Sequence, residues 1–256
     1  MLLASIEMTA FSFDNSPYPI RDDLVAAYRA FWKELSQAGT WWTGEERVAI
    51  AAEVRAATQC PFCAERKEAL TPYNLSGQHT AAADSLLDDN AIDAVHRIFS
   101  DQTRITRSWI RENVNRGLSE GRYVELVGVT VCVFSIDEFC RALGLPLEPL
   151  PEPVAGSPSE YVPVGLETHT ARVAMVDLEQ SGPEEQDLWP KGRTGNVVRA
   201  LSQVPNAARE WIGLSNSQYL PLHKVVDPSS DTERVLNRQQ IEIVAGRVSS
   251  HNECFY

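Results

Sequence analysis

The sequence predicts an all-α protein in which a proline-rich segment joins two related helical units. Apolar residues recur at spacings of three and four over most of the first 145 residues, which is typical of amphipathic helices. Alternation of apolar and polar residues, the pattern of a half-buried strand, is confined to short segments. We therefore predict one unit at 1–144, a linker or arm at 145–195, and a second unit at 196–256.

Local helix signals define the start of the first unit. Residues 22–37 carry an apolar stripe on one side. Thr43, followed by Glu46 three residues later, predicts a capping box that opens the next helix. Pro61 suits the first turn of a helix, so a short helix is expected to begin around Cys60.

The rest of the first unit is also expected to be helical. After a loop that contains His79, helices are predicted at 91–99, 105–117 and 119–143. The last segment includes alternating valines from Val127 to Val133, a β-branched run that would also suit a strand. Charged residues on either side of this run fall at helical phase, which favours a helix.

The remaining elements follow a proline-rich stretch. Six prolines remove backbone donors and forbid a helix: Pro146, Pro149, Pro151, Pro153, Pro158 and Pro163. The stretch is therefore a linker or an extended arm that wraps the first unit. A short extended piece is expected at 171–176, and helices at 196–201, 206–214 and 237–248.

Composition excludes several classes of function. The net charge of −12 disfavours a nucleic-acid partner, which requires a basic face, and disfavours an anionic membrane surface. The longest apolar stretch, residues 126–134, is well short of the roughly 20 residues that span a bilayer. The first residues lack the basic region of a secretory signal. Five cysteines, an odd number, argue against a disulfide framework and for a reducing compartment, so a cytoplasmic location is expected.

A weak internal repeat relates the two units. When Cys254 is placed over Cys60, an offset of 194 residues, Ala245 falls on Ala51 and Val248 falls on Val54. The same offset places Tyr256 on Phe62. Two alanine- and valine-rich helices that each end in a cysteine would produce the same pattern without a shared origin.

The spacing around these cysteines resembles a known signature. Glu242, eleven residues and then Cys254 are similar to the start of the motif of the AhpD-like alkylhydroperoxidase and carboxymuconolactone decarboxylase superfamily. That motif is Glu, eleven residues, Cys-x-x-Cys, three residues and His. Cys60-Pro-Phe-Cys63 resembles its cysteine pair, and the resemblance covers most of 20–145 and 196–256. It implies an all-helical, oligomeric protein that reduces hydroperoxides.

Neither copy of the motif is complete. Val48 stands where the first copy should have its glutamate, and Glu46 and Glu53 are the nearest acids. Lys67 replaces the histidine after the first pair, and His79 could serve as the proton relay in its place. The second copy keeps Glu242 and Cys254 and is incomplete.

The cysteine pair itself suits thiol chemistry. The N-terminus of a helix favours the thiolate over the thiol, and Arg66 with Lys67 would add to this effect. A thiolate can attack a peroxide to form a sulfenic acid, with which a second cysteine then condenses. By the resemblance, Cys63 attacks and Cys60 resolves, and His79, Glu46, Glu242 and Cys254 are further candidate catalytic residues.

Other interpretations of the pair stay open. Buried cysteines can simply pack as small apolar side chains. Zinc would require two further ligands, and His79 and His96 are the nearby candidates, although they are much farther apart than the usual three to five residues. A glutaredoxin-like site would require a preceding strand, whereas a helix is expected there. His96, on an apolar helix face, is interpreted as structural.

These observations favour a metal-free, thiol-dependent peroxidase without a cofactor. Its partners would be a small hydroperoxide, a thiol reductant and further copies of the same chain, with neither nucleic acid nor membrane. Trp41 and Trp42 are expected either in the core or at an exposed apolar subunit interface. The alternatives are a non-catalytic helical scaffold and a lyase related to the decarboxylases, which would not require the cysteine pair.

Overall fold

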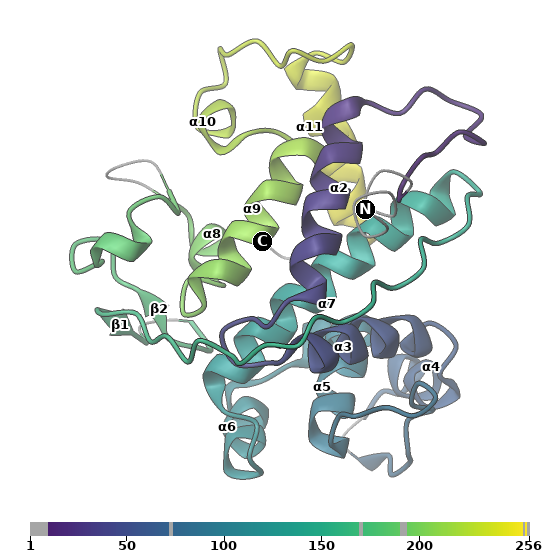
Figure 1. Ribbon diagram of the computed structural model, residues 1–256, viewed down its shortest axis with the longest axis vertical. Helices are drawn as coiled ribbons and strands as arrows, with labels where there is room; N and C mark the ends of the chain where they lie inside the picture. Colours follow the sequence, from purple (N-terminus) through teal and green to yellow (C-terminus); the bar gives the residue numbers. More distant parts are fainter. Residues whose placement is uncertain (1–9, 72–73, 169–170, 190–193, 253, 255–256) are drawn as a thin grey trace.

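The computed structural model describes residues 10–252 except 72–73, 169–170 and 190–193, together with Cys254. Helices dominate the described chain, as the sequence predicts, and the only strands there are two of two residues each (Figure 1). In chain order the elements are α2 (Asp22–Ser36), α3 (Gly44–Ala57), α4 (Pro61–Glu68), α5 (Asp89–Ser100), η2 (Gln102–Arg104), α6 (Arg107–Asn115), α7 (Glu120–Ala142), β1 (Leu166–Glu167), β2 (Met175–Val176), η3 (Pro183–Glu185), α8 (Asn196–Arg199), α9 (Pro205–Gln218), α10 (Leu222–Val225) and α11 (Arg238–His251).

The helix starts follow local sequence signals. The Thr43 side chain accepts the backbone N–H of Glu46, and the Glu46 carboxylate accepts the backbone N–H of Thr43, which confirms the predicted capping box of α3. Pro61 is the first residue of α4, where its missing N–H removes no helical hydrogen bond. Cys60 occupies the N-cap position of this helix. Both cysteines of the pair therefore lie at the N-terminus of one helix.

The valine-rich segment is helical, as predicted, and forms part of the long helix α7. Leu126, Val129, Val133 and Ile136 are completely buried and recur at spacings of three and four. α7 packs against α3, α5 and α9. Burial against three helices therefore outweighs the modest preference of valine for strands.

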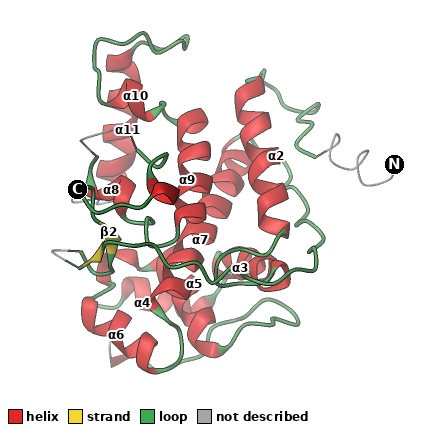
Figure 2. Ribbon diagram, turned by 60° about the vertical axis from the view of Figure 1, so that its left-hand side comes forward, coloured by secondary structure: helices red, strands yellow, loops and turns green. Residues whose placement is uncertain are grey.

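One apolar core extends over most of the described helices. Figure 2 shows α7 between α9 on one side and α3 and α5 on the other, and α2 packs on α9 and α3. Val129 of α7, Phe31 of α2 and Ala207 of α9 belong to the same buried cluster. The core thus crosses the predicted boundaries at 144 and 196, and the division into two units stays a prediction.

The aromatic residues lie mainly in this core. Phe31, Trp32 and Trp42 are each at most 5% exposed, and Trp41 is half-buried. The expectation of an exposed apolar surface at Trp42 was therefore wrong. Its indole N–H donates to the carbonyl of Arg122, so the only polar atom of the ring is satisfied.

The proline-rich segment lies as an extended arm along the first helices. The backbone N–H of Val154 donates to the carbonyl of Ser36 at 2.8 Å, and Ser159 donates to Gly39 at 3.1 Å. The indole of Trp32 donates to the carbonyl of Pro149 at 2.8 Å. The prolines of this segment lack backbone N–H groups, and its other backbone groups form hydrogen bonds with α2 and with the loop that follows it.

The short extended piece expected at 171–176 coincides in part with β2. This strand pairs antiparallel with β1, with Leu166 opposite Val176 and Glu167 opposite Met175. Among the described residues, no helix is long and apolar enough to cross a membrane.

The proposed repeat has a structural counterpart at the offset of 194 residues. Helices α3 and α11 are both 14 residues long and begin and end at matching positions under this offset. Asn237 and Gln240 form a capping box that corresponds to the box of Thr43 and Glu46. The environments differ, because α3 contributes to the core and α11 has no buried residue. The match of Tyr256 with Phe62 lies outside the described residues.

Candidate functional site

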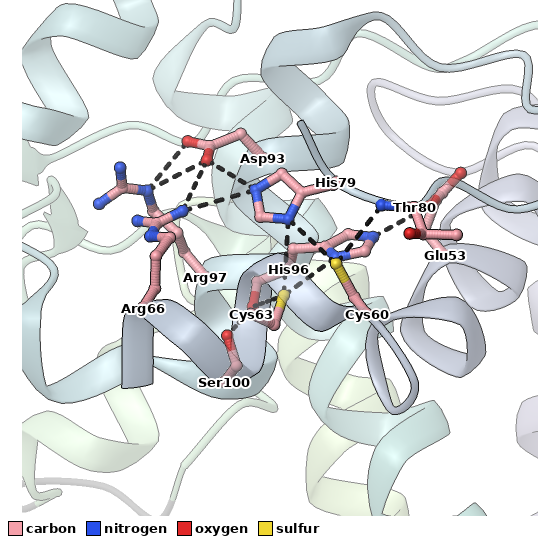
Figure 3. A network of polar contacts seen from close by, with 10 residues as sticks. All are labelled: Glu53, Cys60, Cys63, Arg66, His79, Thr80, Asp93, His96, Arg97 and Ser100. Carbon is pink, nitrogen blue, oxygen red and sulfur yellow. Dashed lines mark hydrogen bonds and ion pairs between the residues drawn. The ribbon is translucent and has the colours of Figure 1, made fainter. Parts of the chain in front are cut away.

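Two cysteines and two histidines converge inside the bundle (Figure 3). The sulfur atoms of Cys60 and Cys63 and one ring nitrogen each of His79 and His96 all lie within 4.8 Å of one another. Cys63 Sγ is 3.2 Å from His96 Nδ1 and 3.5 Å from His79 Nδ1. Cys60 Sγ is 3.6 Å from the same His79 atom. The two imidazole rings lie beside each other, with centroids 4.3 Å apart.

Separate parts of the chain supply these side chains. Both cysteines come from the start of α4, and His96 comes from the middle of α5. His79 belongs to the loop between these helices, where its ring packs 5.0 Å from the ring of Phe62. A Cβ on Gly77 would lie 2.5 Å from the Phe62 ring, so only glycine permits this close approach of the loop. The loop thereby holds His79 over the first turn of α4.

The tautomer of His79 follows from its partner on α5. Its Nε2 lies 3.0 Å from Asp93 Oδ1, and an ionised carboxylate can only accept, so Nε2 carries a proton. Asp93 also accepts from Arg66 at 3.0 Å and from Arg97 at 3.0 Å. The Nδ1 atom of His79 is thus directed at both sulfurs.

His96 has an equivalent arrangement on the other side of the pair. Its Nε2 donates to Glu53 Oε2 at 3.2 Å, and both side chains are completely buried. Glu53 also accepts the backbone N–H of Ala82 at 3.1 Å. The hydroxyl of Ser100 donates to the His96 carbonyl at 2.7 Å and reinforces this part of α5. Each histidine is therefore oriented by a carboxylate while its Nδ1 faces sulfur.

The environment favours the thiolate form of the cysteines. Burial alone would raise the pKa of Cys63, but hydrogen bonds with His79 and His96 outweigh burial and lower this pKa to about 6. Burial also opposes ionisation of Cys60, whose pKa is nevertheless lowered by the backbone N–H of Thr80, 3.4 Å from its sulfur, and by His79. The buried Cys140 on α7 differs, because burial and the charge of Asp137 raise its pKa to about 11.

The pKa values of the two histidines are raised, whereas that of Asp93 is lowered. Burial disfavours the imidazolium, yet hydrogen bonds with Asp93 and Cys63 raise the pKa of His79 to about 10. Burial is likewise outweighed at His96, where Cys63 and Glu53 raise the pKa to about 9. Despite burial, the pKa of Asp93 falls to about 2 through its hydrogen bond with His79 and the charge of Arg97. In the metal-free reduced protein, thiolates and imidazolium groups thus stabilise one another.

The structure brings together three of the residues expected in the site, Cys60, Cys63 and His79. Glu46 lies elsewhere, where it caps α3 and forms an ion pair with Arg122. Glu242 on α11 is exposed and accepts hydrogen bonds from Tyr219 and Arg238.

The remaining expectations concern Cys254, Lys67 and Arg66. Cys254 is exposed and is not a member of the cluster. Lys67 is exposed on α4, whereas Arg66, which was expected to act with it on the thiolate, is buried and binds Asp93.

Three residues of the site were not among the catalytic residues expected from the sequence. His96 was interpreted as structural and was otherwise considered only as a possible zinc ligand, yet it makes the shortest of the three sulfur–nitrogen contacts in the cluster. Glu53 and Asp93 orient the two histidines and were not proposed as site residues. One available signal was the spacing of Asp93 and His96, which places a carboxylate and an imidazole on one side of a helix.

The four converging side chains are also the one group of potential metal ligands found among the described residues. Two sulfurs and two imidazole nitrogens are the donor set of structural zinc sites. In the sequence, His79 and His96 are farther apart than the ligands of most zinc sites. In the folded chain, however, the loop that carries His79 and the helix that carries His96 both lie against the cysteine pair.

Comparisons with known proteins assign the chain to no family, so its classification depends on the geometry of the site. No protein-family model matches the chain, and no curated protein and no solved structure shows a match.

Proposed function

We propose that the protein is a thiol-dependent peroxidase, similar to the AhpD-like alkylhydroperoxidases, that reduces hydroperoxides through Cys60 and Cys63. The observation that carries this proposal is the position of Cys63 Sγ, which lies 3.2 Å and 3.5 Å from the Nδ1 atoms of His96 and His79. Each of these imidazoles is backed by a buried or half-buried carboxylate. A cysteine held as a thiolate by two adjacent imidazolium groups is an activated nucleophile.

The first step would oxidise Cys63. Its thiolate attacks the terminal oxygen of the hydroperoxide, an S–O bond forms, and the O–O bond breaks. The alkoxide leaves as an alcohol after taking a proton from the imidazolium of His96. The products are a sulfenic acid on Cys63 and one molecule of alcohol.

The second step would form the disulfide. The thiolate of Cys60 attacks the sulfur of the sulfenic acid, an S–S bond forms, and hydroxide leaves as water with a proton from His79. The two sulfurs lie within 4.8 Å, so a small movement of Cys60 at the helix boundary brings them to bonding distance. A dithiol reductant then returns the pair to the reduced state by thiol–disulfide exchange.

Access and cellular setting follow from the same geometry. Both cysteines are 3% exposed, and His79 is the most exposed member of the cluster, so the hydroperoxide would enter past His79. The need for a thiol reductant fits a reducing compartment such as the cytoplasm. We also propose that the chain binds neither nucleic acid nor membrane, in keeping with its net charge of −12, and that it self-associates, as the resemblance to the AhpD-like proteins implies.

The test is peroxide consumption by metal-free reduced protein together with a count of its free thiols. Two thiols should disappear for each equivalent of peroxide. Cys63→Ser should abolish consumption, and Cys60→Ser should allow one turnover and leave a sulfenic acid that a dimedone-type reagent labels. Cys140→Ser, which changes an equally buried cysteine on α7, is the matched control and should behave as wild type. An unchanged thiol count in the wild type would refute the proposal and favour a non-catalytic scaffold.

A further inference from the structure

We infer that the reduced protein binds one zinc ion through Cys60 Sγ, Cys63 Sγ, His79 Nδ1 and His96 Nδ1. All four atoms are within 4.8 Å of one another, and they come from the start of α4, the following loop and α5. Zinc prefers four such ligands at the corners of a tetrahedron. The inference goes beyond the proposed peroxidase activity and does not depend on it.

The distances fit this geometry. Bond lengths of about 2.3 Å to sulfur and about 2.0–2.1 Å to nitrogen place the sulfur and nitrogen atoms of a tetrahedral zinc site about 3.6 Å apart. Three of the four sulfur–nitrogen distances here are 3.6 Å, 3.5 Å and 3.2 Å, and the fourth, between Cys60 and His96, is at most 4.8 Å. A zinc ion would therefore enter with small adjustments of the side chains, without a change in the helices.

Hydrogen bonding alone explains the cluster incompletely. His79 Nδ1 lies almost equally far from the two sulfurs, at 3.6 Å from Cys60 and 3.5 Å from Cys63. One ring nitrogen carries a single proton or a single lone pair in the ring plane, so it cannot be aligned with both sulfurs. Cys63 is in turn contacted by two imidazoles. A cation at the centre would satisfy all of these atoms together.

The surrounding residues prepare both histidines as ligands. Asp93 holds Nε2 of His79 at 3.0 Å, and Glu53 holds Nε2 of His96 at 3.2 Å. Carboxylates in this position fix the ring orientation and increase the basicity of the coordinating nitrogen in zinc sites. Arg66 and Arg97 balance the charge of Asp93, and the charges of two thiolates would balance that of zinc.

The site is closed, which favours a holding role for the metal over a catalytic one. Cys60 and Cys63 are 3% exposed and His96 is fully buried, and four protein ligands leave no position for a water molecule. Zinc would thus join the loop that carries His79 to α4 and α5. If the proposed peroxidase activity is also correct, zinc would protect the reduced pair. Oxidation by a hydroperoxide with two protons would then yield the disulfide, an alcohol, water and free zinc.

The experiment is a calorimetric titration of metal-free reduced protein with Zn²⁺ as the only metal. We expect one Zn²⁺ per chain, with release of protons that depends on pH because the ligands must be deprotonated. Substitution by Co²⁺ should produce the intense visible bands of four-coordinate cobalt and thiolate-to-metal charge transfer. This spectrum is measured on the wild type, so it does not depend on the folding of a variant.

Variants identify the ligands. Cys63→Ser should weaken Zn²⁺ binding and reduce the thiolate-to-cobalt charge transfer, and His96→Gln should weaken binding and alter the four-coordinate cobalt spectrum. Glu53→Gln should weaken binding by about 10- to 100-fold. Cys140→Ser should bind as wild type. Absence of stoichiometric binding, a six-coordinate cobalt spectrum, or equal binding by Cys63→Ser would overturn the inference.

The two proposals fail separately. Stoichiometric zinc binding by a protein whose metal-free form consumes no peroxide would refute the peroxidase and support the zinc site. Peroxide consumption by a metal-free protein that binds no zinc would do the reverse.

Discussion

The thiolate of Cys63 is the property on which the proposed chemistry depends most directly. The pKa of Cys63 is lowered from its ordinary value of 9.0 to about 6, because hydrogen bonds to His79 and His96 outweigh the effect of burial. At pH 7 these two values correspond to about 90% and about 1% thiolate, a ratio of about 90-fold. We therefore expect wild-type Cys63 to be almost fully ionised at neutral pH.

Replacement of His96 by glutamine should remove one of the two partners. The pKa of Cys63 should then rise from about 6 toward its ordinary value of 9.0, because only His79 and the Ser100 hydroxyl remain to offset burial. At pH 7 the thiolate population should fall by less than the limiting factor of about 90. Glu53→Gln should shift the pKa in the same direction by a smaller amount, since it acts only through His96.

The assay is the ultraviolet absorbance of the thiolate as a function of pH in metal-free reduced protein. The Cys60→Ser background, measured with and without Cys63→Ser, isolates the signal of Cys63. The thiolate is favoured because the folded-state pKa is depressed, so its stabilisation is complete above the ordinary value of 9.0 and is lost as the pH falls through about 6. A wild-type midpoint near 9, or a midpoint that His96→Gln leaves unchanged, would refute this account of the site.

Other predictions concern the structure around the site. Arg47, which is 1% exposed, joins Glu125 of α7 and Glu210 of α9, so Arg47→Met should lower the free energy of unfolding by about 3–5 kcal/mol in urea titrations. Burial, partly offset by Arg47, raises the pKa of Glu210, so this group stabilises the fold below its ordinary value of 4.5 and loses that contribution as the pH rises through the higher folded-state value. Glu210→Gln should remove this pH dependence from thermal melts, and an unchanged slope would contradict it. Gly39→Ala should lower the melting temperature, because its Cβ would lie 1.8 Å from Glu125 Oε1. Light scattering should detect self-association, and a mass of 28.5 kDa at micromolar concentration would contradict that expectation.

Local features of the structure could be predicted from short sequence patterns. The capping box of Thr43 and Glu46, the start of α4 at Pro61 and the helical nature of α7 all depend on residues within a few positions of one another. The placement of Cys60 and Cys63 on one helix start follows from their spacing for the same reason. The equal lengths of α3 and α11 also agree with the repeat detected in the sequence.

Only the tertiary structure decided which groups surround the cysteine pair. The sequence alone determined an all-α chain, the helix that carries Cys60 and Cys63, and His79 as a candidate near them. The packing of α5 on α3 and α4 brought in His96, which follows Cys63 by 33 residues, and placed Glu53 behind it. Glu46 satisfies the local rule for a helix cap and for that reason lies at the helix end, away from the cluster. Helix caps depend on neighbours in sequence, whereas convergence of four ligand atoms depends on how apolar faces pack, which no local spacing specifies.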